Sequence, residues 1–464
     1  MPDLRDHEAE VARALTWLGK SVPFADVMAE AAAGGSVRVD TKSTGPQVEP
    51  RLQGAVFRVW DGGRWLESAT SAFDAHTLNA AVDALELTAK KSSRHAPPPG
   101  TPSTTKGDWT TKSAHPMRDV SVEEMVKLGR DARDWACSAP SVIDAQVGIG
   151  WEDNERLYLN SAGARCYQLV SRTRAGMAAI AMENGRVEFD FDSEGRVGGK
   201  EVLGFLTEEH AKALGAGARA MLGAAAPPTG EMTVVLDPGV SGLFAHESFG
   251  HGTEADQFVR DRSYLKPILG QQVGPEFLTI VDDGSFAGGW GMIYCDDEGH
   301  PAQRTTLVDH GKFVGALHDR ETAAVLGARA TGNTRRADFL SRAFVRMTNT
   351  FVEPQNWSFE EILQEAKNGV LLERGTSGIE DPMGGQMQLK VKRGHLIENG
   401  KLTKLVGSMA LSGKVLDFLR ATRAVGREET VTMEPGFCGK GHTDLLPVGS
   451  GGAHLLSTAI VGPA

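Results

Sequence analysis

Two histidines and a glutamate lie close together in the second half of the chain, within the segment 243–258. His246 is followed directly by Glu247, and His251 comes five residues after His246. Neutral imidazole is a good zinc ligand, and catalytic zinc usually takes three protein ligands and keeps one position for water. A glutamate beside the first ligand can act as general base. The segment therefore points to catalytic zinc chemistry.

The five-residue spacing of the two histidines does not fit a regular helix. At 3.6 residues per turn, side chains five residues apart point about 140° away from each other. A single π-type turn would return them to one face, and such bulges are frequent at functional sites. Gly250, directly before His251, lowers the cost of a distorted backbone. We expect His246 and His251 to be ligands on a distorted helix; on a regular helix they would be unrelated histidines.

A buried strand should lead into this helix. Residues 233–236 are β-branched or apolar, and the turn sequence Asp-Pro-Gly follows at 237–239. The histidine segment is thus expected to be a helix entered from a turn at the end of a strand.

The candidate third ligand is Cys438, in the glycine-rich segment 436–442. Neighbouring glycines and a lysine favour an accessible thiolate of low pKa, and a thiolate would complete a His2Cys zinc site with one open position. Two other interpretations stay open from the spacing alone. Cys438 and His442 could be a nucleophile and its base, or the segment could be an anion-binding glycine turn with Lys440.

Composition and charge restrict the class of protein. The chain has 464 residues, 41% hydrophobic and 23% charged, as expected for a soluble globular protein of two or three domains. Its net charge of −11 argues against nucleic acid and anionic membranes as partners. The sequence shows no bilayer-spanning apolar run and no apolar signal region, and four cysteines form no disulfide framework. These features predict a cytoplasmic protein.

Hydrophobic periodicity and turn residues predict an α+β protein in four successive parts. We expect an N-terminal α+β domain at 1–91, a Pro/Thr-rich linker or loop at 92–118, a middle α+β segment at 119–226 and a mainly β C-terminal domain at 227–464. The expected helices are 5–19, 24–33, 74–90, 121–137, 207–222, 359–368 and 412–424. The clearest strand signals are 36–39, a hairpin over 53–69, several strands over 142–191 and an Asn-Gly hairpin turn at 399–400.

Several further motifs accompany the histidine segment, and their order along the chain is informative. They are 246–256 (HESFGHGTEAD), 282–284 (DDG), 296–299 (DDEG), 330–336 (ATGNTRR), 346–350 (RMTNT) and 437–441 (FCGKG). Together these motifs resemble the TldD/PmbA family of metalloproteases, in its metal-bearing, TldD-like branch. The resemblance spans roughly the last 200 residues of the chain and is weaker towards the N-terminus.

The resemblance implies specific roles. His246 and His251 match the family's histidine ligands to zinc, Cys438 its cysteine ligand and Glu247 its general base. It also implies an α+β N-terminal part, a mainly antiparallel C-terminal domain and a subunit that pairs with itself or with a related subunit lacking the metal residues. The substrates would be unstructured peptides, threaded into an enclosed cavity and held as an added strand.

The remaining polar residues of these motifs have less certain roles. Glu254 and Asp256 could orient His246 or His251, or they could form a solvated acidic turn. Lys440 could contact them or the substrate. His442 departs from the glutamine that the family more often has, and it is either a substrate contact or a bystander.

Three functions are compatible with these residues. The leading one is a zinc-dependent peptidase that hydrolyses unstructured or modified peptides inside an enclosed dimer cavity. The alternative is a non-catalytic peptide-binding or partner subunit of a protease complex, which would not need all four of His246, Glu247, His251 and Cys438. The third is a cysteine hydrolase using Cys438, which sensitivity to chelators would separate from the first.

Overall fold

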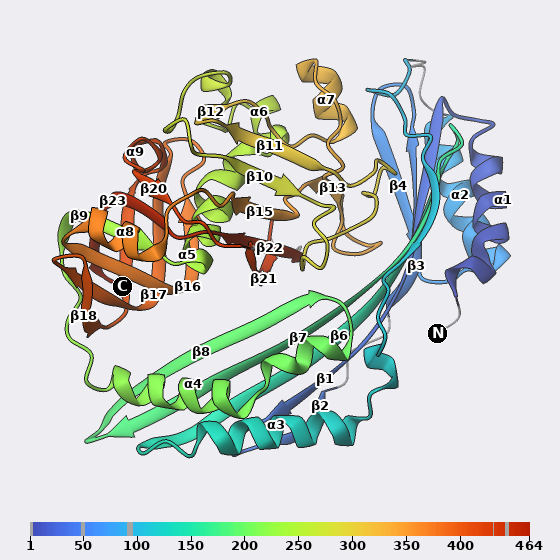
Figure 1. Ribbon diagram of the computed structural model, residues 1–464. Coiled ribbons are helices and arrows are strands. Elements are labelled where there is room, and N and C mark those ends of the chain that lie inside the picture. The colour runs from blue at the N-terminus through green and yellow to red at the C-terminus, as the bar shows by residue number, and fades with distance from the viewer. Residues whose placement is uncertain (1–2, 48–51, 91–95, 430, 441–444) are drawn as a thin grey trace.

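The computed structural model describes residues 3–47, 52–90, 96–429, 431–440 and 445–464. The N-terminal half forms one long curved sheet with helices, and the C-terminal half lies along the other side of that sheet (Figure 1). The fold is α+β, with a β-rich C-terminal part, as predicted. None of the described helices combines the length and the apolar character needed to cross a membrane.

The N-terminal sheet has eight strands in the order β4-β3-β1-β6-β7-β5, with β2 paired to β1 and β8 paired to β7. All of these pairings are antiparallel except β5–β7. The strands are β1 Phe24–Val39, β2 Thr44–Gln47, β3 Leu52–Trp60, β4 Trp65–Thr70, β5 Lys106–Thr110, β6 Val142–Asn160, β7 Arg165–Glu183 and β8 Arg186–Val197. The strand β5 thus lies within the expected linker segment.

The prediction of a helix over 24–33 is wrong, because these residues begin the 16-residue strand β1. Their alanines favour a helix locally, but β1 lies between β3 and β6 and pairs with both over most of its length. Ala29 and Ala31 are buried in the core beneath α1 and α2. Tertiary pairing and burial therefore override the helix preference of alanine.

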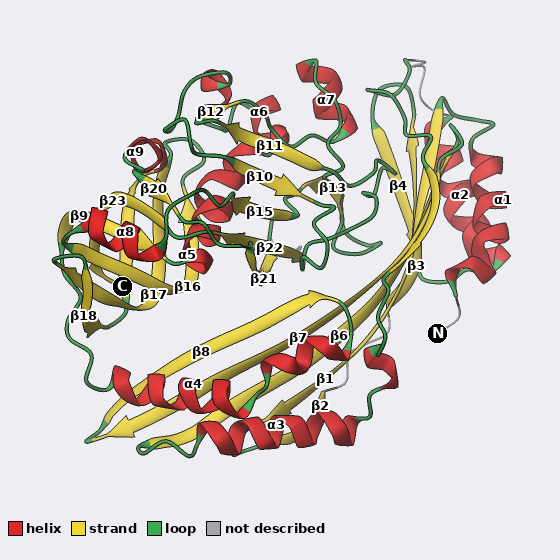
Figure 2. Ribbon diagram, in the orientation of Figure 1, coloured by secondary structure: helices red, strands yellow, loops and turns green. Residues whose placement is uncertain are grey.

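Two pairs of helices cover the N-terminal sheet and leave its other side to the C-terminal half (Figure 2). α1 (Glu8–Leu18) and α2 (Ala75–Ala89) pack on one end, and α3 (Val122–Ala136) and α4 (Glu208–Met221) on the other. Asp74 and Ser121 cap α2 and α3 with their side chains, in agreement with the predicted starts. Short 3-10 turns are η1 Leu4–His7, η2 Met117–Asp119 and η3 Lys200–Phe205.

The C-terminal half contains two main sheets. One has the path β16-β9-β23-β19-β17-β18, and the additional β16–β17 pairing closes part of it on itself; the other runs β12-β11-β10-β15-β22-β21. Most pairings are antiparallel, with β9–β16 and β15–β22 parallel. The strands are β9 Gly230–Leu236, β10 Ile280–Asp283, β11 Arg304–Asp309, β12 Lys312–Phe313, β13 Thr334–Arg335, β14 Phe344–Val345, β15 Asn349–Val352, β16 Gly369–Glu380, β17 Gln386–Glu398, β18 Lys401–Val406, β19 Met409–Lys414, β20 Ala424–Val425, β21 Thr432–Cys438, β22 Leu446–Gly452 and β23 Leu455–Pro463.

The helices of this half are short. They are α5 Pro238–Leu243, η4 Phe244–Gly250, η5 His251–Thr253, α6 Ala255–Val259, η6 Lys266–Ile268, α7 Arg320–Leu326, α8 Phe359–Ala366 and α9 Val415–Arg420. The helix predicted over 412–424 is only partly present, because its first residues pair in β19 with both β17 and β23. The Asn-Gly hairpin is confirmed, with positive φ at Asn399 and Gly400 between β17 and β18.

Buried ion pairs join the two halves. Arg58 of β3 bonds to Asp26 at 2.7 Å and to Glu298 of the C-terminal half at 2.9 Å. Arg156 of β6 bonds in the same way to Glu30 and to Asp297, both at 2.8 Å. The acidic residues after β10 thus hold the sheet against the C-terminal half, which fixes the shape of the space between them.

Candidate metal centre

A strand, a short helix and a π-helix position His246 and His251. β9 ends at Leu236, and the Asp237 carboxylate caps α5 by accepting a bond from Val240 N at 2.7 Å. α5 continues into the seven-residue π-helix η4, and His251 N–H donates to His246 O, the bond from residue i to i−5. The strand predicted from residues 233–236 and the π-type turn predicted from the histidine spacing are both confirmed.

The need for a glycine at position 250 has a different cause from the one expected. Its φ of −58° is ordinary helical backbone, so the residue does not ease a strained conformation. A Cβ at this position would instead lie 2.2 Å from Met347 Sδ. The glycine is required because the π-helix packs closely against Met347.

We expect Gly250→Ala to lower the free energy of unfolding by about 1–3 kcal/mol, because the added methyl would overpack against Met347. Gly148→Ala is the matched control, since nothing lies within 4 Å of a Cβ there, and it should change stability by no more than about 0.5 kcal/mol. Urea unfolding of both variants measures the difference. Equal stability of Gly250→Ala and Gly148→Ala would contradict the close contact. In the double variant, Met347→Ala should remove the overpacking and so reduce the destabilisation caused by Gly250→Ala.

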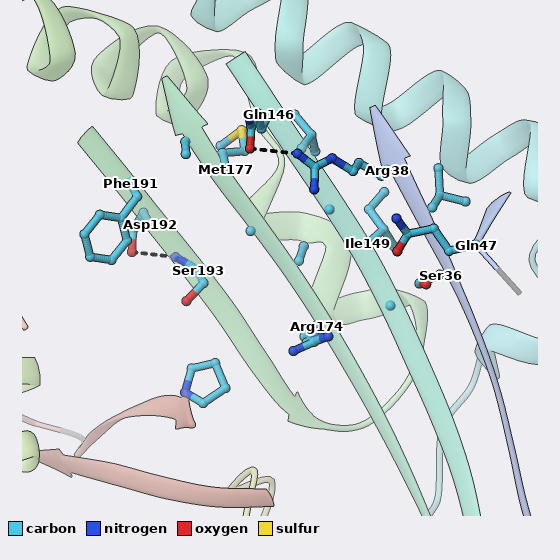
Figure 3. A pocket seen from close by; sticks show the side chains of 18 of the residues that line it. Ser36, Arg38, Gln47, Gln146, Ile149, Arg174, Met177, Phe191, Asp192 and Ser193 are labelled. Atoms are coloured by element: carbon cyan, nitrogen blue, oxygen red, sulfur yellow. Dashed lines mark hydrogen bonds between the residues drawn. The ribbon is translucent and has the colours of Figure 1, made fainter. Parts of the chain in front are cut away.

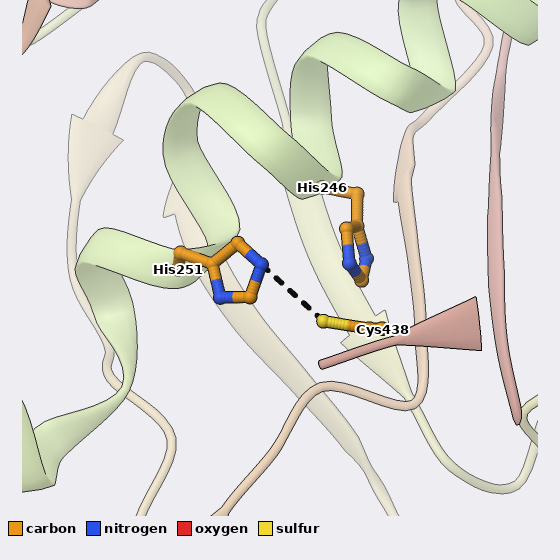
Figure 4. Close-up of side chains that lie close together, drawn as sticks. All are labelled: His246, His251 and Cys438. Atoms are coloured by element: carbon orange, nitrogen blue, oxygen red, sulfur yellow. Dashed lines mark hydrogen bonds between the residues drawn. The ribbon is translucent and has the colours of Figure 1, made fainter. Parts of the chain in front are cut away.

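Cys438 is the last residue of β21, and its side chain faces the two histidines (Figure 4). Its Sγ lies 3.3 Å from His251 Nε2, and the ring centroids of His246 and His251 are 5.3 Å apart. One ligand atom from each residue lies within 4.8 Å of the others. In the part of the chain that the structure describes, this is the one cluster of His, Cys, Asp or Glu side chains so arranged.

The donor set suits zinc. Both ring nitrogens of His246 are buried and lack a hydrogen-bond partner among the described residues. Burial raises the pKa of the Cys438 thiol, but His246 and His251 beside it lower that pKa to about 4. Cys438 therefore offers a thiolate at neutral pH, and a thiolate with two imidazoles is a ligand set that zinc prefers. The residues present thus fit a zinc ion.

Glu247 lies on the same π-helix as His246, with its carboxylate near the ligand atoms. Its Oε2 lies 3.7 Å from His251 Nε2, and its side chain is 27% exposed. The stem packs against β16, where a Cβ on Gly378 would lie 2.6 Å from Glu247 Cβ. The side chain is therefore fixed by β16 at its stem, and its partly exposed carboxylate lies beside the ligand atoms.

The other acidic residues of the segment lie behind His251. Glu254 Oε2 lies 3.4 Å from His251 Nδ1, the ring nitrogen away from Cys438. Lys440 Nζ donates to Glu254 Oε2 at 2.9 Å and to Asp256 Oδ1 at 2.7 Å. Burial raises the pKa of Glu254, but Lys440 and His251 lower it to about 2, so that this carboxylate is ionised at neutral pH. The structure thus gathers the three residues into one buried ion-pair cluster.

Comparison with known proteins agrees with these observations. The sequence model of the PmbA/TldA metallopeptidase C-terminal domain matches residues 229–459, and that of the central domain matches residues 115–224. A metalloprotease of Methanothermobacter thermautotrophicus is 31% identical over 443 residues, which cover 95% of this chain and 96% of the relative. The chain belongs to the PmbA/TldD metallopeptidase family.

Other PmbA/TldD relatives support the same assignment. A metalloprotease of Methanocaldococcus jannaschii is 35% identical over 321 residues, 68% of this chain and 69% of the relative. A zinc metalloprotease TldD homolog of Saccharolobus solfataricus is 30% identical over 230 residues, 49% of this chain and 51% of the relative. The structure of TldE from Thermococcus kodakarensis superposes with a TM-score of 0.75 at 19% identity, covering 98% of this chain and all of that one. At that identity, the likeness shows the fold alone.

One residue beside the metal centre of this PmbA/TldD protein, Glu380, carried no signal in the sequence. Glu380, at the end of β16, has both carboxylate oxygens buried next to Tyr264, and a Cβ on Gly252 would lie 3.3 Å from one of them. Burial raises the pKa of Glu380 to about 8. Glu380 lies more than a hundred residues from the histidines along the chain and in no recognisable motif. Its position beside the metal centre is therefore seen only in the folded structure. His442, which the sequence left open as substrate contact or bystander, lies outside the described residues.

Proposed function

We propose that this protein is a zinc-dependent peptidase in which His246, His251 and Cys438 hold the metal. The observation that supports it most is the convergence of three ligand atoms within 4.8 Å, with both nitrogens of buried His246 otherwise unpartnered. The name of the Saccharolobus relative, a zinc metalloprotease, supports the choice of metal. Zinc bound there would supply a Lewis acid that makes water acidic near neutral pH and polarises a peptide carbonyl.

The chain's own residues supply the proton transfers. Glu247 takes the proton of the attacking water on its carboxylate and returns it to the leaving amine. Glu254 accepts a hydrogen bond from His251 Nδ1–H, which fixes the tautomer and leaves Nε2 free to bind. Lys440 neutralises Glu254 and Asp256, and through them it holds the position of His251.

A cavity of about 470 Å³ between the N-terminal sheet and β21 is the proposed peptide site. Arg38, Gln146, Arg174 and Asp192 give it polar walls (Figure 3). β21 is the edge strand of its sheet, so its free backbone groups can pair with an extended peptide, unstructured or modified, as an added strand. A second subunit, either a related chain or another copy, would enclose this cavity. The four free cysteines suit the cytoplasm as its location.

Metal analysis together with activity tests the proposal. Purified protein should contain about one zinc per chain and should cleave a quenched fluorogenic pool of unstructured peptides, alone or with its partner subunit. A chelator should abolish cleavage, and zinc should restore it. Cleavage that survives removal of all metal would favour a cysteine hydrolase. If the protein binds peptides but cleaves none of them, even when zinc and the partner subunit are supplied, the result would favour the alternative function of a non-catalytic peptide-binding subunit.

A further inference from the structure

A second, smaller cavity of about 150 Å³ lies where the N-terminal sheet meets the loops of the C-terminal half. It has three arginines in its walls: Arg156, Arg172 and Arg335. Its apolar lining comes mainly from Val170, Ile293, Phe437, Leu445, Leu446 and Pro447. A mixture of cationic and apolar walls of this size suits a small group that carries both a negative charge and a hydrocarbon part.

Two of the three arginines are buried and bond mainly to backbone carbonyls. Among the described residues, Arg335, which is 4% exposed, donates to the carbonyls of Met347 at 2.6 Å and Pro447 at 2.7 Å. Arg172 is 5% exposed and likewise donates to two backbone carbonyls, both at 2.8 Å. The nearest acid to Arg172 is Glu152 at 3.9 Å, and no carboxylate among the described residues forms an ion pair with Arg335.

The acids in the same cavity lie closest to the other two arginines. Glu30 and Asp297 bond to Arg156, each at 2.8 Å, and Glu152 lies 3.9 Å from Arg172. Burial raises the pKa of Asp296 to about 8, so this residue is mostly uncharged at neutral pH. Burial also lowers the pKa of Arg335 to about 9, which still leaves the guanidinium charged. Arg335 is thus a buried guanidinium that no carboxylate of the described residues bonds directly, and an anion bound in the cavity would give it such a partner.

We propose that this cavity binds the C-terminal carboxylate of the peptide substrate, an inference that rests on the proposed peptidase function. Arginine is the side chain best suited to a carboxylate, because its planar N–H groups can bond both oxygens. A volume of about 150 Å³ holds a carboxylate and one modest side chain but not a longer peptide. The cavity therefore receives the end of a chain.

Phe437 connects this cavity to the proposed peptide site, because it lines both. Phe437 also directly precedes Cys438 on β21, and neighbouring residues of a strand point to opposite faces. A peptide anchored at Arg335 thus reaches the metal centre around the free edge of β21. Because one end of the peptide is held at Arg335, cleavage should release a C-terminal fragment of fixed length.

The test compares one peptide in two forms. A fluorescein-labelled, unstructured Gly/Ser/Leu peptide is made as the free acid and as the C-terminal amide, and its binding to zinc-loaded Glu247→Ala protein is followed by fluorescence anisotropy. We expect the acid to bind about 10- to 100-fold more tightly than the amide. Adding Arg335→Met should reduce the affinity for the acid to that for the amide. Arg13→Met, which changes an arginine whose side chain is 70% exposed, should leave the difference intact.

Equal binding of the acid and the amide would overturn the inference, and so would a preference for the acid that survives in Arg335→Met. The comparison of the acid with the amide needs no change at Arg335. It therefore tests the inference even if Arg335→Met fails to fold. The experiment measures binding and not turnover. A protein that prefers the acid but never hydrolyses any peptide would therefore contradict the proposed function and leave the carboxylate site standing.

Discussion

Glu247→Ala should lose about 10³-fold or more of the peptidase activity while keeping about one zinc per chain. Glu247 lies beside the ligand atoms, with Oε2 3.7 Å from His251 Nε2, but it is not one of the three converging donors. Its removal takes away the proposed acceptor of the attacking water's proton, and general-base catalysis contributes about 10² to 10⁴ in rate. The measurement is kcat/KM on a quenched peptide, with zinc determined on the same preparation.

Two further variants sharpen this expectation. Glu247→Gln keeps the shape of the side chain but cannot accept the proton, so it should fail as Glu247→Ala does. Glu209→Ala removes an exposed glutamate from the first turn of α4 and should leave activity unchanged. Activity retained by zinc-loaded Glu247→Ala would remove the base role. Loss of zinc from that variant would instead make Glu247 part of the metal-holding set.

Cys438→Ser and His246→Ala should each weaken zinc binding by at least about 100-fold and abolish activity. A serine hydroxyl stays protonated at neutral pH, so it cannot replace the thiolate that the two histidines stabilise. His246 has no hydrogen-bond partner among the described residues, and removing it subtracts a ligand without breaking another bond. Loss of an outer partner typically costs 10- to 100-fold, and loss of a direct ligand should exceed this. Competition with a chromogenic chelator measures the affinity.

Cys137→Ser is the matched control for the thiol, because Cys137 is a free cysteine at the end of α3, away from the centre. It should bind zinc as the unaltered protein does. Normal zinc affinity in Cys438→Ser would exclude Cys438 as a ligand and restore the interpretation of that residue as a nucleophile.

The sequence predicted the part of the site that local geometry determines. His246 and His251 can share a metal only if the helix contains a π-type turn, so the hypothesis of a shared metal, together with their spacing, predicted the backbone that the structure shows. Cys438 is 187 residues from His251, and no local rule connects the two. It was assigned from the family resemblance, and the fold does bring its sulfur to the histidines.

Other features depend on tertiary contacts that no short window contains. The alanines of 24–33 favour a helix by propensity, yet pairing with β3 and β6 makes them a strand. Gly250 was expected to lower the cost of a distorted backbone, whereas a glycine is needed there because of the close contact with Met347, almost a hundred residues later. Arg335 was recognised only as part of a family motif. Its burial without an ion pair among the described residues appears once the sheet, the loop after β10 and β22 enclose it.

The separation of the metal ligands along the chain has a consequence for synthesis on the ribosome. The π-helix follows β9, and β9 is flanked by β16 and by β23, which is made later than Cys438. While the chain is being translated, the two histidines therefore lack both Cys438, their proposed third ligand, and one of the strands that support them. The proposed metal centre can form only after Cys438 has emerged, so the proposed peptidase would stay inactive until its own folding is nearly complete.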